Sequence, residues 1–280
     1  MIAIVDYDAG NIRSVENAMK VLGEDAVLTG DPNVIADADR VILPGVGAFG
    51  DAMERIRARG LESVLQDVCR RGTPFLGICL GLQLLFDESE ESPGVKGLSI
   101  LPGRIVRFPA DMPEGSFGSS DTARSGGGRP VPAYDSPLPA AGCKGADTHE
   151  PGSIGAGKGI PPVSDCIRAP GAGAAAGCNT AGAGIRYLKV PEIGWNDLSY
   201  PDNGNSRRLF RNVPEHSHVY FVHSYYLEAA DPEMVAARSD YGIAFDASVE
   251  AGNIFACQFH PEKSERIGMQ ILRNFLSVPV

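Results

Sequence analysis

Three side chains of this sequence have the types and the spacing for nucleophilic chemistry. The first is Cys79, at the centre of the pattern Gly77-x-Cys79-x-Gly81. The apolar segment 73–76 before it is typical of a buried strand, and the segment 82–86 after it predicts the first turns of a helix. Glycines two residues to either side indicate a nucleophile elbow, whose sharp turn leaves no room for side chains there. The amides and positive dipole end of a helix start favour a thiolate, so the pattern predicts that Cys79 is a nucleophile.

The other two side chains lie near the end of the sequence. His260, Pro261 and Glu262 follow the apolar run 254–259. The proline favours an extended backbone before it, and side chains two residues apart in an extended segment project to the same side. A cysteine, a histidine and a carboxylate that orients the imidazole are the parts of a nucleophilic triad. Cys79 alone would fit a buried structural cysteine equally well, and His260 with Glu262 is what favours catalysis.

The elements that must position Cys79 alternate along the first part of the sequence. The predicted strands are 2–5, 26–28, 40–43 and 73–76, and the predicted helices are 12–22, 48–59 and 61–70. Such alternation predicts an α/β fold, a doubly wound and mostly parallel sheet with flanking helices. Sites in these sheets form at the carboxyl ends of the strands, which is where Cys79 lies.

A glycine-rich turn, Pro44-Gly45-Val46-Gly47, lies at the end of a neighbouring predicted strand. Glycine-flanked peptides rotate at little steric cost, so an amide of this turn can point toward the site or away from it. We therefore predict an oxyanion hole made by the amide of Leu80 and an amide from Gly45 and Val46. A tight connection between strand and helix would also account for two glycines.

The last part of the sequence contains more strands. Residues 219–226, 235–238 and 244–249 are β-forming, and 267–276 has the apolar spacing of a final helix. Three histidines, 216, 218 and 223, lie close together here. We interpret them as polar residues on the outer face of a strand rather than as metal ligands.

Residues 110–184 have a different composition from the rest of the chain. They are rich in glycine and proline and poor in large apolar side chains, which predicts a segment without a core of its own. The irregular spacing of its three cysteines and one histidine does not favour a metal site. We predict a disordered, low-complexity insertion within a single domain that spans residues 1–280.

The overall composition limits the kinds of partner that the protein can bind and the cellular compartment that we expect for it. The formal net charge of −10 argues against binding to nucleic acid or to an anionic membrane. The six cysteines contain no CxxC pair, and the N-terminus lacks the basic region of a signal peptide. No apolar stretch is long enough to cross a bilayer. These features predict a cytoplasmic protein.

Over about residues 1–109 and 186–280, the sequence resembles the class I, triad-type glutamine amidotransferases. The matching motifs are Asp8–Asn11, Pro44–Gly50, Gly77–Phe86, Gly194–Asn196, Phe221–Tyr225 and Gln258–Ser264. Within this family, three features point to the glutaminase subunits of imidazole glycerol phosphate synthase, from histidine biosynthesis: the Pro44–Gly47 turn, Leu82 before Gln83, and Gly194–Asn196. The insertion departs from the family pattern, in which Phe108 would run almost directly into Lys189.

The resemblance implies hydrolysis of the side-chain amide of glutamine without a metal or an organic cofactor. Cys79 would attack the carboxamide, His260 would move the proton, and Glu262 would fix the imidazole. The residues implied to hold glutamine are Gly47, Gln83, Glu91, Ser224 and Tyr225. Ammonia would pass to a (β/α)8-barrel cyclase subunit in a heterodimer, with Asn11 and Trp195 at the interface.

Three other functions fit parts of the sequence. The chain could be the glutaminase of another synthase, such as anthranilate or pyridoxal phosphate synthase, although Leu82 and the Pro44–Gly47 turn weigh against this. It could be a stand-alone cysteine peptidase acting on γ-glutamyl substrates. It could also be a catalytically inactive binding module, against which the complete set of triad residues argues.

Overall fold

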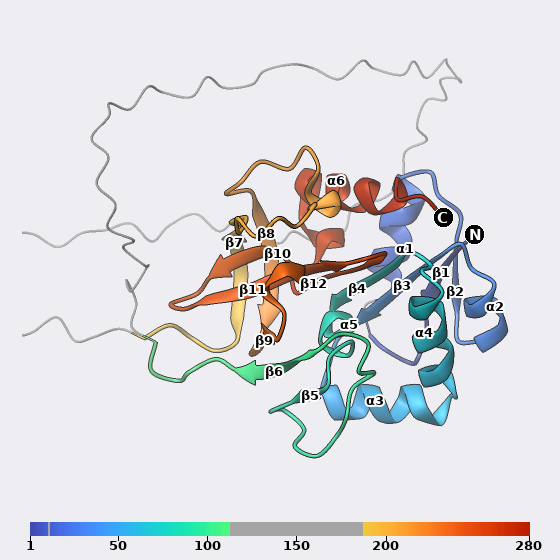
Figure 1. The fold of residues 1–280 in the computed structure, drawn as a ribbon, viewed down its shortest axis with the longest axis horizontal. Helices are drawn as coiled ribbons and strands as arrows, with labels where there is room; N and C mark the ends of the chain where they lie inside the picture. The colour runs from blue at the N-terminus through green and yellow to red at the C-terminus, as the bar shows by residue number, and fades with distance from the viewer. Residues whose placement is uncertain (11, 113–186) are drawn as a thin grey trace, which may run out of the picture. The chain divides into compact units, whose positions relative to one another are not determined.

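The structure of the chain, a computed structural model, describes residues 1–10, 12–112 and 187–280 (Figure 1). Most of the predicted 110–184 insertion therefore lies outside the described residues. The elements up to the predicted nucleophile are β1 (Ile2–Val5), α1 (Ile12–Val21), β2 (Ala26–Thr29), α2 (Pro32–Ala36), β3 (Arg40–Gly45), α3 (Phe49–Ala58), α4 (Leu61–Arg70), β4 (Phe75–Cys79) and α5 (Leu80–Gln83).

The remaining elements are mainly strands. They are β5 (Glu88–Ser89), β6 (Gly103–Arg107), β7 (Glu192–Asp197), η1 (Arg208–Phe210), β8 (His218–His223), β9 (Tyr225–Ala229), η2 (Pro232–Met234), β10 (Val235–Asp240), β11 (Ala244–Ala251), β12 (Ile254–Cys257), η3 (Pro261–Lys263) and α6 (Glu265–Leu276). In the described ranges, no helix is both long and apolar enough to cross a membrane.

The main sheet has ten strands and combines a parallel half with an antiparallel half. Its order is β2-β1-β3-β4-β12-β11-β9-β6-β5, with β10 paired to β11. Strands β2, β1, β3, β4 and β12 are parallel, whereas β11 is antiparallel to β12, β10 and β9. The predicted doubly wound, mostly parallel α/β fold is confirmed. The antiparallel half comes from the β-rich C-terminal part of the chain.

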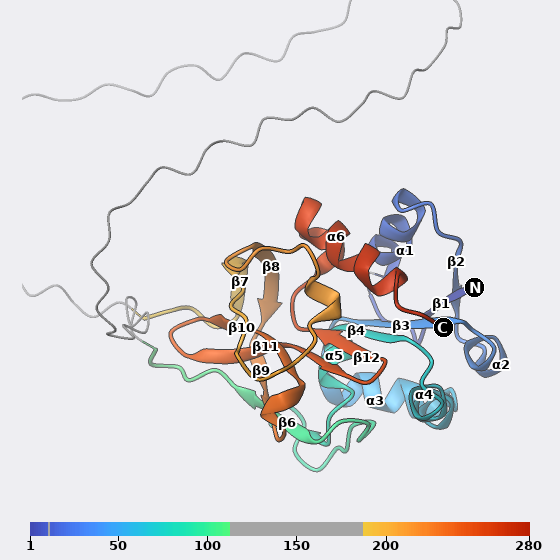
Figure 2. The ribbon, with the colours of Figure 1, turned by 45° about the horizontal axis from the view of Figure 1, so that its top comes forward.

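Alternating side chains build an apolar core on each face of the sheet. Along β1, Ile2 and Ile4 join one buried cluster, while Ala3 and Val5 join the other. Helices α1 and α6 close the first core, and α3 and α4 close the second. Both ribbon views show these helix pairs on opposite faces of the sheet (Figures 1 and 2). Because helices cover both faces of the sheet, the parallel strands are buried and hold the residues at their carboxyl ends in fixed positions.

Local differences between prediction and structure include a shortened helix, an unpredicted helix and a broken strand. The helix predicted over 82–86 ends at Gln83, because the carbonyls of Leu84, Leu85 and Phe86 accept bonds from the chain at 98–101 instead. The short helix α2, capped by the side chain of Asp31, was not predicted.

The third difference is the single strand predicted over 219–226, which breaks at Ser224. Strand β8 pairs with β7 in a separate two-stranded sheet, while β9 joins the main sheet between β11 and β6. The break therefore lies where the chain passes from one sheet to the other.

Candidate active site

Cys79 occupies a strained turn between β4 and α5. Its φ of 56° and ψ of −112° are rare for a residue with a side chain. A Cβ at Gly77 would lie 2.7 Å from the carbonyl oxygen of Gly81, and a Cβ at Gly81 would lie 1.8 Å from that of Leu43. The two flanking glycines are thus required by the close approach of backbone segments, as expected of an elbow.

The neighbouring strands bring the other predicted catalytic segments to this turn. Strand β3 pairs in register with β4, so that Gly45 lies opposite Cys79. On the other side of β4, β12 runs parallel and ends at Cys257, three residues before His260. The carboxyl ends of three adjacent parallel strands therefore carry the predicted nucleophile, the predicted oxyanion turn and the predicted base.

His260 and Glu262 form a buried pair, with Nδ1 of the imidazole 2.8 Å from Oε1 of the carboxylate. The segment is not extended throughout, as the sequence suggested. Only His260 has an extended backbone, and Pro261 begins the 3-10 turn η3, because proline also suits the first position of a helix. Ser264 fixes this turn, since its hydroxyl donates to the carbonyl of His260 and accepts from the amide of Tyr220.

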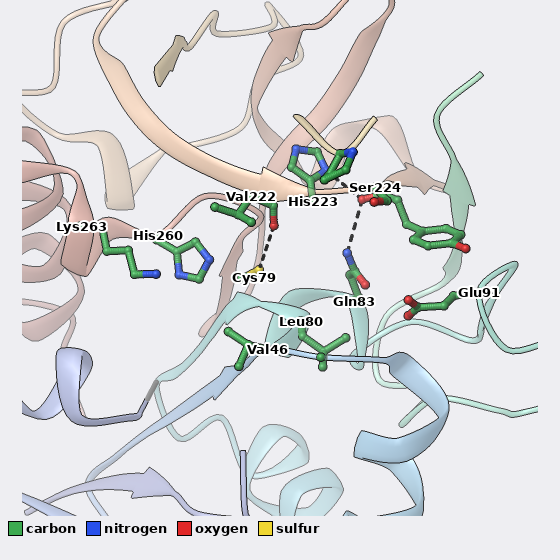
Figure 3. Close-up of a pocket in the computed structure, with 13 residues that line it drawn as sticks. Val46, Cys79, Leu80, Gln83, Glu91, Val222, His223, Ser224, His260 and Lys263 are labelled. Atoms are coloured by element: carbon green, nitrogen blue, oxygen red, sulfur yellow. Dashed lines mark hydrogen bonds between the residues drawn. The ribbon is translucent and has the colours of Figure 1, made fainter. Parts of the chain in front are cut away.

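The surroundings of His260 favour its protonated form. Burial lowers its pKa, but hydrogen bonds and charge interactions with Cys79 and Glu262 outweigh burial and raise the pKa to about 9. Figure 3 shows the imidazole beside the sulfur. An imidazolium next to the sulfur stabilises a thiolate, the form in which cysteine attacks carbonyl carbon.

We expect the imidazole of His260 to titrate near pH 9 in the full chain and at a lower pH in Cys79→Ala, which removes one of its two partners. The folded pKa lies above the unfolded value of 6.5, so the resulting stabilisation is complete below about pH 6.5 and is lost as the pH rises through about 9. An NMR titration of the histidine ring protons measures the pKa of His260 in the unsubstituted chain and in Cys79→Ala, and Cys69→Ala is the control. Equal titration midpoints in all three proteins would contradict this coupling.

A pocket of about 300 Å³ opens above Cys79 (Figure 3). Its lining includes all the residues predicted to hold glutamine, namely Gly47, Gln83, Glu91, Ser224 and Tyr225. Cys79, His260, Leu80 and Val46 line it as well. Two predicted residues, Gly45 and Glu262, instead line a smaller hollow shared with Val46 and His260. The fold thus gathers the predicted triad, oxyanion and substrate residues at one place.

Two polar side chains at the rim of this pocket are held by the backbone. Gln83 donates from Nε2 to the carbonyl of Tyr225 at 3.3 Å. The Glu91 carboxylate accepts from the amide of Phe49 at 2.7 Å, at the start of α3, where the helix dipole favours a negative charge. Both side chains are therefore preorganised to meet the polar groups of a small ligand.

His223 is a pocket residue that the sequence interpretation misplaced. It is buried rather than on an outer face, because it alternates with the buried residues Val219 and Phe221 along β8. Its Nδ1 lies 2.8 Å from the carbonyl of Tyr225, and its Nε2 lies 3.1 Å from the buried carboxylate of Glu192. This period-two alternation was the signal that could have located it. Within the described ranges, no group of three His, Cys, Asp or Glu side chains is placed to hold a metal ion.

The two residues predicted at a partner interface have different outcomes. Asn11 lies outside the described residues. Trp195 lies on β7 with 48% of its surface exposed, and its ring is 5.9 Å from that of Tyr220. Lys263, which lines the pocket, lies 6.0 Å from the same tyrosine ring. The exposed tryptophan is thus connected to the pocket rim through one aromatic ring.

The chain is similar to known proteins in sequence and in structure. The sequence model described as glutamine amidotransferase class-I matches residues 3–278. The chain is 38% identical to the imidazole glycerol phosphate synthase subunit HisH of Syntrophotalea carbinolica, covering 98% of each sequence. It is 36% identical to the protein of the same name from Methanothermobacter thermautotrophicus, covering 99% of this chain and 98% of that protein.

Solved structures share the fold at much lower sequence identity. A crystal structure of a glutamine amidotransferase matches with a TM-score of 0.56 and 16% identity, covering 99% of this chain and 97% of the other. The structure of PurLQS from Thermotoga maritima matches with a TM-score of 0.53 and 17% identity, covering 98% and 96%. With the family match and these relatives over nearly its whole length, the chain belongs to the class I glutamine amidotransferases.

Proposed function

We propose that the chain is the glutaminase subunit of an imidazole glycerol phosphate synthase and acts in histidine biosynthesis. The observation that carries this proposal is the similarity to subunits of that name, at 36–38% identity over nearly the whole of both sequences. The pocket supports it, because one small cavity joins a buried cysteine–histidine–glutamate arrangement to polar groups suited to an amino acid.

In this proposal, Cys79 attacks the side-chain carboxamide carbon of glutamine. His260 takes the thiol proton and returns it to the departing ammonia, while Glu262 holds the imidazole and offsets its charge. The amide of Leu80 and an amide of Gly45 or Val46 stabilise the oxyanion. Water, deprotonated by His260, then cleaves the thioester to give glutamate and regenerate the thiol.

The substrate itself is held at the opposite end of the pocket from His260. Gln83, Glu91 and the main chain at Ser224 and Tyr225 face the α-amino and α-carboxylate groups of glutamine, with Gly47 alongside. Figure 3 shows Gln83, Glu91 and Ser224 on one side of Cys79, and His260 and Lys263 on the other. A bound glutamine would then place its side chain toward the sulfur.

The ammonia acceptor in this proposal is a (β/α)8-barrel cyclase that forms a cytoplasmic heterodimer with the chain. Asn11 and Trp195 contribute to the interface. An exposed tryptophan supports this, because large aromatic side chains supply much of the binding energy in interfaces. Residues 110–184 are an insertion in this single glutamine amidotransferase domain.

The test is a glutaminase assay with the full chain alone, with a purified barrel cyclase, and with the cyclase and its nucleotide substrate. We expect slow glutamate release from the chain alone and strong stimulation in the complete mixture. A γ-glutamyl peptide assayed in parallel separates this function from that of a peptidase. Peptide turnover in place of glutamine turnover would contradict the proposal, as would the absence of any response to the cyclase.

A further inference from the structure

Gln258 is a fully buried amide that contacts the sulfur of Cys79. It follows β12 and precedes Phe259 and His260, and its backbone amide donates to the carbonyl of Ala247 at 2.9 Å. Its Nε2 lies 3.8 Å from Sγ of Cys79. The proposed mechanism assigns a role to His260, two residues later, but none to the side-chain amide of Gln258.

The orientation of the amide follows from the groups around Gln83. Gln83 Nε2 donates both to the carbonyl oxygen of Tyr225, at 3.3 Å, and to Oε1 of Gln258, at 3.0 Å. The carbonyl of Tyr225 can only accept, so the NH2 group of Gln83 must face it. The oxygen of Gln258 then faces Gln83, and its NH2 group is left facing the sulfur.

We infer that Gln258 is a further catalytic residue, whose side-chain N–H donates a hydrogen bond to the thiolate of Cys79 and connects the sulfur to the glutamine-binding residue Gln83. This inference rests on the proposed function. A neutral amide suits the role, because it stabilises negative charge on the sulfur and takes no proton from it. A buried donor acts at low local dielectric, where a hydrogen bond to a charged acceptor is strong.

The sulfur has other ionisable groups around it. Those that can carry charge are His260, Glu262 and Lys263 after β12, Cys257 at the end of β12, Tyr7 after β1, His223 on β8, and Glu91 and Tyr225 at the pocket rim. Because all of them remain in Gln258→Met, which adds no ionisable group, a change in the pH dependence of Cys79 alkylation in this variant reports the loss of the amide.

The test is the pH dependence of Cys79 alkylation by iodoacetamide, followed in the full chain by mass spectrometry of the peptide that contains Cys79. Gln258→Met keeps the side-chain length without the N–H and adds no charge, whereas Gln258→Glu replaces the donor by a carboxylate with its negative charge. We expect the pH midpoint of alkylation to rise by about one unit or more in both variants, with roughly tenfold slower alkylation at pH values well below the midpoint. Gln66→Met is the matched control, since its amide donates to the carbonyl of Leu98.

A midpoint in folded Gln258→Met equal to that of the unsubstituted chain would overturn the inference. If neither variant folds, the unsubstituted chain provides the answer by NMR. The side-chain amide resonances of Gln258 should then shift with the titration of Cys79, and constant resonances would also overturn it. The alkylation and NMR experiments use neither glutamine nor a partner, so their results can be interpreted even if the proposed function is wrong. Conversely, a negative result for Gln258 would not change the outcome of the glutaminase assay.

Discussion

Replacing Cys79 with alanine is expected to abolish glutamine hydrolysis, with a loss of at least about 10⁴-fold, because the remaining groups cannot form a thioester. The fold should survive. The side chain is small, its neighbours are the Val222 carbonyl, the Gln258 amide and the His260 imidazole, and alanine is scarcely less suited than cysteine to the positive φ at this position. Glutamate release measured with a coupled assay gives the activity, and circular dichroism gives the fold.

The ammonium-driven reaction is the control for this substitution. In the complex with the cyclase, an added ammonium salt supplies ammonia directly, so synthesis by Cys79→Ala should proceed as with the unsubstituted chain. Cys69→Ala is the matched variant, because burial raises the pKa of the Cys69 thiol to about 12 and leaves it inert. Substantial glutamate release by Cys79→Ala would show that Cys79 is not the nucleophile.

The second large effect is expected at the turn that follows β3. Val46→Pro removes the only N–H that residue 46 can offer to an oxyanion, and one missing donor costs on the order of 100- to 1,000-fold in rate. Gly45 ends a strand paired to Cys79, while Gly47 has a φ of 102°, a conformation that glycine adopts freely. A peptide between such residues can change its orientation at little cost.

We expect Val46→Pro to lower the stimulated glutaminase rate far more than the rate of the chain alone. Binding of the cyclase and its nucleotide would favour the orientation in which the N–H of residue 46 points toward the oxyanion. Val46→Ala keeps the N–H and should retain stimulation. Glutaminase rates with and without cyclase and nucleotide measure both. If the chain alone already reaches the stimulated rate, the amide of residue 46 points toward the oxyanion permanently, and the proposed change of its orientation on partner binding is wrong.

Much of the fold and most of the pocket could be predicted from local sequence patterns. The alternation of elements before Cys79 gives the parallel half of the sheet, and helix α4 has the predicted bounds. The elbow was predictable because the Gly77-x-Cys79-x-Gly81 pattern that marks it is local in the sequence. These features depend on near neighbours in the sequence or on simple periodicity.

The misplaced features depend on partners that are remote in the sequence. The helix after Cys79 ends early because the segment 98–101 takes its carbonyls. The alternation along β8 accounts for the burial of His223, but the carboxylate beside its ring, Glu192, lies on a different strand. The contact of Gln258 with Cys79 likewise joins two strands that are far apart in the sequence. Local propensity cannot indicate which distant group will satisfy a buried polar atom.

The side-by-side pairing of β4 with β12 also sets when the chain becomes active during its synthesis. Strand β4 leaves the ribosome well before its neighbour β12, which follows it far along the sequence. Protein synthesis proceeds from the N-terminus at roughly 5–20 residues per second, so the segment of Cys79 is made before the proposed base, His260. In the proposed mechanism, a nascent chain that lacks β12 and His260 therefore consumes no glutamine.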